Sequence, residues 1–210
     1  MTLSWGSGGT SSLAVTGSGV PAPAGGAEVQ AVYALDTAAA GVTCVATGDV
    51  VCADEGFSGL YVKDYQAVTT VVPASASATF QRVSILNPPT PDSWPTEADM
   101  NPQRYVELAV SPSAGKALFV DGISLYAGAD GGSTMGFQIQ YSKHSDFSDA
   151  TELLDSPSNP ASAVNFYSFG PLVAVNPGET LRVRIYPYSK AVVKAKYLCL
   201  QAVTIHGIME

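Results

Sequence analysis

The chain has 210 residues, of which 46% are hydrophobic and only 13% are charged, and its formal net charge at pH 7 is −8. Nucleic acids and anionic membrane surfaces are unlikely partners for this composition, because both are bound through Lys and Arg, and the ten basic residues form no cluster in the sequence. No apolar stretch reaches the roughly 20 residues that span a bilayer, which excludes a membrane-spanning helix.

The N-terminal part of the chain predicts only short strands. The first 28 residues are rich in Gly, Ser, Ala and Pro and contain Trp5. Residues 69–80 fit either a weak strand or a linker. Before that segment, Gly and Asp separate the candidate strands 13–16, 28–35, 42–51 and 59–62.

The three cysteines comprise two that are close in sequence and one that is distant. Cys44 and Cys52 flank a Gly-Asp turn signal, which fits either a disulfide across a hairpin or two small buried side chains. Cys199 lies in an apolar strand run and is predicted to be buried. No histidine lies near a cysteine pair, so a zinc site is not expected.

The pattern becomes regular after residue 80. The loop 87–102 is rich in proline, lacks periodicity and carries Trp94. No helical period persists anywhere, so we predict an all-β fold, an antiparallel β-sandwich of jelly-roll type. The expected strands after residue 80 are 80–86, 105–110, 118–126, 135–141, 164–169, 173–175, 181–188 and 196–206.

One module over residues 1–210 is the preferred domain organisation. The alternative is a division into N-terminal strands over 1–78 and a main sandwich over 79–210. No internal repeat is visible, which disfavours a solenoid or a propeller. The sequence opens without a signal peptide. We therefore expect a module excised from a longer secreted protein.

The strand 181–188 carries the most informative pattern. Leu181, Val183 and Ile185 share one face, because side chains alternate along a strand. The opposite face presents guanidinium groups and phenol rings, which suit a planar ligand that is rich in hydroxyl groups or acidic. The residues on that face are Arg182, Arg184, Tyr186 and Tyr188.

Two further strands would widen this surface if they are its neighbours. Arg82 faces away from Val83, and Tyr105 and Glu107 face away from Val106. Trp94 either caps the core or contacts a ligand. The competing interpretation is a solvated sheet face on which Arg, Glu and Tyr pair across strands without any ligand.

Metal and catalytic chemistry have weaker signals. Asp146, Asp149 and Glu152 have a spacing that suggests a structural calcium ion, but they lack the EF-hand register, so no site is assigned. No other cofactor is expected. His144 and His206 are isolated in sequence, and no Gly-x-Ser-x-Gly elbow is present. We therefore expect that the chain is not an enzyme.

The residues from Phe80 onward resemble an accessory β-sandwich module of secreted Bacteroidota polysaccharide-degrading proteins, notably pectate-lyase-like ones. The resemblance rests on the segments 81–85, 94–95, 104–112, 114–116, 141–142, 177–180, 184–187 and 196–200. It implies a secreted module beside a catalytic domain that is presumed to bind glycan. Tyr188 stands where that family pattern prefers Trp.

Together, these features predict a non-catalytic carbohydrate-binding module that targets an attached enzyme to plant cell-wall polysaccharide, namely pectin, xylan or β-glucan. Weak binding by one module suffices, because attachment raises the local concentration of the enzyme on its polymer. The alternative is a structural spacer or adhesion sandwich without a glycan ligand.

Overall fold

The computed structural model describes residues 25–37, 42–68, 71–72, 74, 77–86, 88, 93–130, 134–156 and 163–210. Within these ranges the chain forms strands and no helix, which confirms the all-β prediction. It follows that this part of the chain has no helix that could cross a membrane. The candidate strand 13–16 and Trp5 lie outside the described residues.

The larger of two main sheets contains nine described strands: β1 (Ala27–Tyr33), β2 (Val45–Thr47), β5 (Leu60–Ala67), β6 (Val71–Val72), β7 (Thr79–Ile85), β10 (Leu118–Asp130), β13 (Val164–Phe169), β14 (Val173–Val175) and β17 (Tyr197–Met209). The strand order is β2-β1-β17-β10-β13-β6, while β14 pairs with β10 and β7 pairs with both β17 and β5. Every pair is antiparallel except that of β13 with β6.

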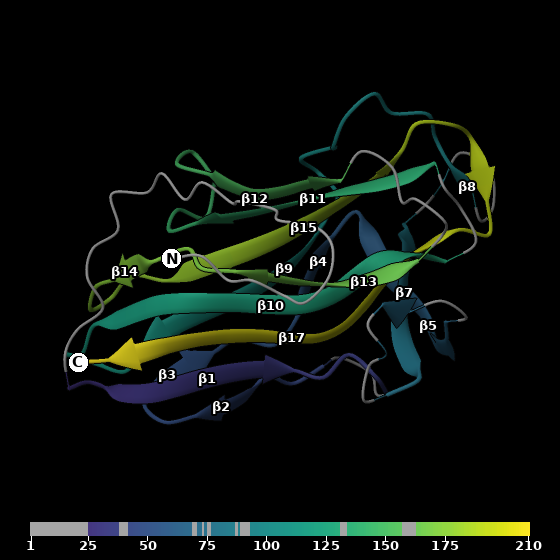
Figure 1. Ribbon diagram of the computed structural model, residues 1–210. Helices are drawn as coiled ribbons and strands as arrows, with labels where there is room; N and C mark the ends of the chain where they lie inside the picture. Colours follow the sequence, from purple (N-terminus) through teal and green to yellow (C-terminus); the bar gives the residue numbers. More distant parts are fainter. Residues whose placement is uncertain are drawn as a thin grey trace, which may run out of the picture.

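The smaller sheet contains β3 (Val50–Cys52), β4 (Gly56–Ser58), β9 (Tyr105–Pro112), β11 (Met135–Ser142), β12 (Thr151–Ser156) and β15 (Leu181–Ser189). Its order is β12-β11-β15-β9-β3, and β4 also pairs with β9. Figure 1 shows β12, β11, β15 and β9 in one layer and β10, β17 and β1 in the other. The ribbon of β8 (Ser93–Trp94) and β16 (Val193–Lys194) lies at one end.

The core lies between these layers. Along β9, buried and partly exposed residues alternate at every step, so that Val106, Leu108 and Val110 point inward. Leu181, Val183 and Ile185 do the same on β15. The larger sheet supplies the opposing side chains, such as Ile123 and Ile205. Apolar burial from both layers is the main stabilising term in such a sandwich.

The N-terminal strands are divided between the two sheets. β1 pairs with β17 from Ala27 to Tyr33, whereas β3 and β4 pair with β9. A disulfide joins Cys44, directly before β2 of the larger sheet, and Cys52, at the end of β3 of the smaller sheet, with the Cα atoms 6.0 Å apart. Cys199 is buried, as predicted. The organisation of residues 1–210 as one module stays a prediction, since residues 1–24 lie outside the described part.

Four strands are absent from the sequence-based prediction, namely β4, β8, β12 and β16. β12 is an edge strand in which exposure does not alternate, so its sequence gives no period of two. β8 lies inside the proline-rich segment 87–102, where no periodicity exists, and forms only because β16 pairs with it. β12 pairs with the preceding strand β11, whereas β8 depends on a partner about a hundred residues away that local sequence does not reveal.

Candidate functional site

The outer face of the smaller sheet gathers most of the predicted site. β15 places Arg182, Arg184, Tyr186 and Tyr188 on this face, because Leu181, Val183 and Ile185 turn to the core. In the β9 register, Arg184 lies opposite Glu107. The ring of Tyr105 also belongs to this face, with its centroid 5.7 Å from that of Tyr186. Trp94 and Arg82 lie elsewhere.

Most of this face is enclosed, which corrects the expectation of an open aromatic surface. The guanidinium carbon of Arg184 lies 3.8 Å from the ring centroids of both Tyr105 and Phe147. Its Nε bonds Glu107 Oε2 at 2.6 Å, and Nη2 donates to the Ser145 carbonyl at 2.9 Å. The residue is only 8% exposed. Arg184 is therefore fully occupied by contacts within the protein.

The two tyrosines of β15 are buried as well. Tyr186 is 2% exposed and packs edge-on against Tyr105 and Phe147. Tyr188 is 1% exposed and its hydroxyl donates to Asp155 at 3.2 Å. Burial raises the pKa of Tyr188 to about 12. Neither ring can stack on a sugar, because no open ring face remains.

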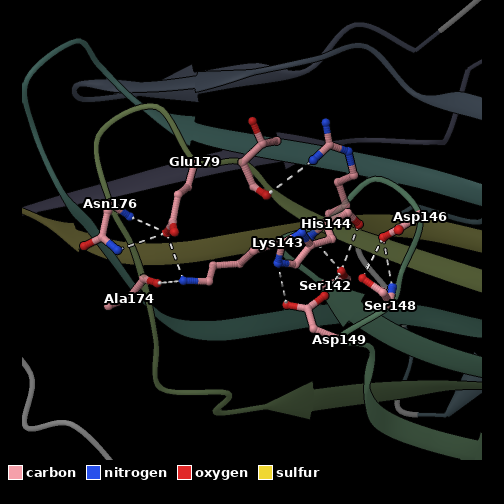
Figure 2. Close-up of polar contacts among 11 residues, drawn as sticks. Ser142, Lys143, His144, Asp146, Ser148, Asp149, Ala174, Asn176 and Glu179 are labelled. Atoms are coloured by element: carbon pink, nitrogen blue, oxygen red, sulfur yellow. Dashed lines mark hydrogen bonds and ion pairs between the residues drawn. The ribbon is translucent and has the colours of Figure 1, made fainter.

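The segment that covers these side chains is the covering loop, residues 143–150 between β11 and β12. Figure 2 shows how its own polar groups fix it. The Ser142 hydroxyl donates to Asp149, while the Ser148 amide donates to Asp146 at 3.1 Å. These bonds lower the pKa of both carboxyls. Phe147 takes a φ of 57°, a left-handed conformation that turns the chain back over the sheet.

A second contact ties the covering loop to the turn before β15. Lys143 Nζ lies 2.9 Å from Glu179 Oε2, and the same oxygen accepts from the Asn176 amide at 2.9 Å (Figure 2). These bonds lower the pKa of Glu179, with the Asn176 amide as the largest cause. The loop is thus attached at both ends of its path over the sheet.

The suggested calcium ligands have separate partners: Asp146 and Asp149 belong to the covering loop, whereas Glu152 lies on β12. Asp146 and Asp149 bond Ser148 and Ser142, whereas Glu152 accepts from Gln138 at 2.7 Å. Among the described residues, no group of three or more His, Cys, Asp or Glu side chains is arranged to hold a metal ion. The calcium prediction therefore stays without an assigned site.

Trp94 caps the core, which corrects its assignment as a ligand-facing residue. The side chain is 0% exposed, and its indole N–H donates to the Lys196 carbonyl at 2.8 Å. The segment that follows is joined to β15 by a 2.7 Å bond from the Glu97 amide to the Ser189 carbonyl. The loop has no periodicity, so the sequence alone could not decide between capping the core and contacting a ligand.

Arg82 belongs to the other sheet, so the expected single surface does not include it. On β7 its Nε and Nη2 bond Asp64 at 2.6 and 2.8 Å, and its Nη1 bonds Asp130 at 2.6 Å. The guanidinium also covers the Tyr197 ring. The Arg82 bond lowers the pKa of Asp64. This cluster stabilises the larger sheet and leaves Arg82 little capacity to bind a ligand.

One part of the outer face stays open as a groove of about 330 Å³ over β3, β9 and β15. Ser111 and Thr180 contribute hydroxyls that lie 2.8 Å apart. Ala109 and the β3 side contribute apolar atoms. The lining residues of this groove are Val51, Cys52, Ala53, Glu107, Ala109, Ser111, Thr180 and Arg182.

Arg182 is weakly bound within the protein. Its Nε lies 3.7 Å from Glu107 Oε1, and its Nη1 lies 3.5 Å from the Thr180 carbonyl. The side chains of Arg182 and Glu107 are each 24% exposed. A guanidinium offers five N–H donors, so most of its capacity can serve a ligand. The groove thus combines a charged donor, a carboxylate acceptor and two hydroxyls.

The sequence pattern identified Arg182 and Glu107 but missed the rest of the groove. Continuing the alternation of β9 beyond Tyr105 and Glu107 reaches Ala109 and Ser111, so that signal was available. The β3 wall gave no such signal, because its pairing with β9 joins segments about sixty residues apart, as in Val50 with Pro112.

Comparisons with known proteins find similarity in solved structures alone. No protein-family model matches the sequence, and no curated protein matches it. The enzymatically active domain of tailspike protein 4 from bacteriophage CBA120 is 14% identical with a TM-score of 0.32, over 76% of this chain and 19% of that one. This chain therefore spans about a fifth of that domain.

The alignment with a second solved structure covers most of both chains. The CBM22-1 xylan-binding domain of Paenibacillus barcinonensis Xyn10C is 11% identical with a TM-score of 0.35, over 84% of this chain and 92% of that one. At these TM-scores neither structure bears on the function of this chain.

Proposed function

We propose that this chain is a non-catalytic carbohydrate-binding module whose glycan binds in the groove over β3, β9 and β15. The observation that carries the proposal is the weakly bound Arg182 guanidinium beside the Glu107 carboxylate and the Ser111 and Thr180 hydroxyls. The volume of the groove, about 330 Å³, is at the small end of the range for ligand-binding sites.

The polar groups match the hydroxyls of a sugar. Arg182 donates to hydroxyl or carboxylate oxygens, Glu107 accepts from hydroxyl groups, and Ser111 with Thr180 can do either. Val51, which is 56% exposed, offers an apolar contact for C–H groups. None of the lining residues is aromatic, so we expect weak binding by one module, with attachment to an enzyme supplying the effective concentration.

The proposed setting is a secreted protein that acts on plant cell-wall polysaccharide and carries a catalytic domain on the same chain. The Cys44–Cys52 disulfide supports an oxidising compartment. The resemblance of the residues after Phe80 to accessory modules of polysaccharide-degrading proteins supports the attached enzyme. Pectin, xylan and β-glucan are the polymers to test.

Affinity gel electrophoresis of the wild type, Arg182→Ala and Lys190→Ala in gels containing each polymer tests the site. Lys190 is an exposed residue at the end of β15, so its variant matches the charge change without touching the groove. We expect retardation of the wild type and of Lys190→Ala. Arg182→Ala should bind roughly tenfold more weakly, because a hydrogen bond from a charged group contributes about 1.5–3 kcal/mol.

Equal retardation of Arg182→Ala and Lys190→Ala would place binding outside the groove. Stronger retardation by de-esterified pectin than by xylan would show that Arg182 prefers a carboxylate. Incubation of the same polymers with the protein tests the non-catalytic role, since new reducing ends or unsaturated products would contradict it.

The second candidate is a structural spacer without a ligand. It is favoured by the enclosure of Tyr186, Tyr188 and Trp94, which removes the aromatic rings from the surface. No retardation by any polymer in the panel, with the wild type folded, would support the spacer.

A further inference from the structure

A buried carboxyl group lies directly behind one wall of the groove. Glu55 follows Cys52 and Ala53 of the groove lining, in the segment between β3 and β4, and is only 9% exposed. Its Oε2 accepts a 2.8 Å hydrogen bond from Gln81 Nε2 on β7. The pair therefore links the smaller sheet to the larger one in the interior.

This pair contains two buried oxygens without a hydrogen-bond partner. Among the described residues, the buried side-chain atoms that lack a partner are Glu55 Oε1, Gln81 Oε1, Glu97 Oε2 and Thr134 Oγ1. Glu55 and Gln81 thus contribute one unpaired oxygen each to a pair that is already bonded through its other atoms. An ionised carboxylate and an amide oxygen are both acceptors, so neither can satisfy the other.

A single proton on Glu55 removes both deficits. A protonated carboxyl group has one O–H donor, and an amide has an N–H donor and a carbonyl acceptor. Glu55 can then donate from Oε1 to Gln81 Oε1 while it keeps the bond from Gln81 Nε2. The desolvation cost of a buried unpaired acceptor, about 1–3 kcal/mol each, is avoided at both atoms.

The groups around Glu55 do not favour its ionised form. Tyr65 faces the pair from β5, with its hydroxyl 3.3 Å from Gln81 Nε2, and Tyr33 faces it from β1. Asp54 precedes Glu55 in the chain, and Asp36 lies near Tyr65. None of these four side chains carries a positive charge. Burial raises the pKa of Glu55 to about 7.

We propose that Glu55 is protonated when the groove is intact, and that its ionisation loosens the adjoining residues Cys52 and Ala53, which line the groove. The consequence of this loosening for glycan binding rests on the proposed function. Ala53 transmits the change, because its amide donates to the Ala109 carbonyl at 3.0 Å and its carbonyl accepts from the Tyr33 hydroxyl at 2.8 Å. A charged Glu55 that moves toward water pulls on both bonds.

The direction of the pH effect follows from the raised pKa. The folded protein holds the Glu55 proton up to about pH 7, whereas the unfolded chain releases it near its ordinary pKa of about 4.3. The stabilisation by this proton is therefore complete below about pH 4.3. It declines as the pH rises toward 7 and is absent above that.

Thermal unfolding of the wild type, Glu55→Gln and Glu28→Gln at about pH 5.5 and pH 8.5 tests the protonation. Glutamine reproduces the neutral acid, since its amide can both donate to and accept from Gln81. Glu28 is an exposed carboxylate on β1 and serves as the control. The melting temperatures of the wild type and of Glu28→Gln should decrease from pH 5.5 to pH 8.5. The melting temperature of Glu55→Gln should decrease much less. If the melting temperature of Glu55→Gln decreased as much as that of the wild type, the proposal would be overturned.

Infrared spectroscopy of the wild type gives a readout that does not require the variant to fold. The absorption of a protonated carboxyl group should be present at pH 5.5 and should disappear with a midpoint near pH 7. Its absence at pH 5.5 would show that Glu55 is ionised, which contradicts the proposal.

Movement of the wall is measured by amide hydrogen exchange at Ala53, independently of any ligand. After correction for intrinsic exchange, the protection of the Ala53 amide in the wild type should decrease roughly fivefold or more from pH 5.5 to pH 8.5. Fivefold is about the smallest effect expected when two sites are energetically coupled. Protection that stays constant would refute the link to the groove. If Ala53 responds but no polymer binds at pH 5.5, the proposed function fails while the switch stands.

Discussion

Arg182 and Arg184 occupy the same face of the same strand, two residues apart, and have different surroundings. Both guanidinium groups approach Glu107, but Arg184 bonds Oε2 at 2.6 Å while Arg182 lies 3.7 Å from Oε1. Tyr105, Phe147 and the Ser145 carbonyl surround Arg184. Arg182 instead lines the groove. The position along the strand relative to the covering loop decides which arginine can meet a ligand.

The difference shows how a sheet face divides into an enclosed part and an open part. Where the covering loop lies on the strands, the polar and aromatic side chains satisfy one another and exclude water. Beyond its edge the same type of residue keeps unused donors. An outward-facing arginine is therefore a candidate binding residue only where no second layer covers it.

Arg184→Ala should give the largest loss of stability. The variant leaves the half-buried Glu107 carboxylate without its closest partner, and it removes the guanidinium that packs on the rings of Tyr105 and Phe147. Together these losses should lower the free energy of unfolding by about 3 kcal/mol. Arg182→Ala is the matched control and should cost less than about 1 kcal/mol, as for an exposed pair. Urea unfolding measures both, and equal losses would erase the distinction between the two arginines.

Removal of the disulfide behind the groove should have the next largest effect. Cys44 and Cys52 are eight residues apart, and opening so short a loop is expected to cost about 2–3 kcal/mol through the entropy of the unfolded chain. The double variant Cys44→Ala/Cys52→Ala and the reduced wild type should lose similar stability in urea. Retention of full stability under reducing conditions would show that β3 does not need this bond.

Phe147 tests the covering loop itself. Phe147→Ala removes the ring that packs on Arg184 and Tyr186, with an expected loss of about 1–2 kcal/mol. Phe147→Gly should be more stable than Phe147→Ala by about 1 kcal/mol, because glycine accepts the positive φ without strain. Thermal unfolding decides the order, and a less stable glycine variant would contradict the left-handed conformation.

The smallest effect is expected on the acid side. Asp149 has a lowered pKa, chiefly because Ser142 donates to it, so its contribution to stability is present at neutral pH and is lost as the pH falls below the usual carboxyl range. Asp149→Asn should make the decline in melting temperature between pH 5 and pH 3 slightly shallower. Asp54→Asn, outside the covering loop, is the control and should leave the slope as in the wild type.

The sequence by itself determined the fold class and the orientation of the central strand. A period of two placed Arg182, Arg184, Tyr186 and Tyr188 on one face, because side-chain alternation is a property of the extended backbone. It also placed Tyr105 and Glu107 on the outward side of β9. These are local properties, and the structure agrees with them.

Only the tertiary structure decided what covers each face and which strands are neighbours. Arg82 has the same alternation as Arg184, yet β7 joins the other sheet. Trp94 is buried by the strand pair of β8 with β16, and the covering loop encloses Tyr186 through contacts of Phe147. Burial depends on segments distant in sequence meeting in space, and a strand's own period contains no information about them.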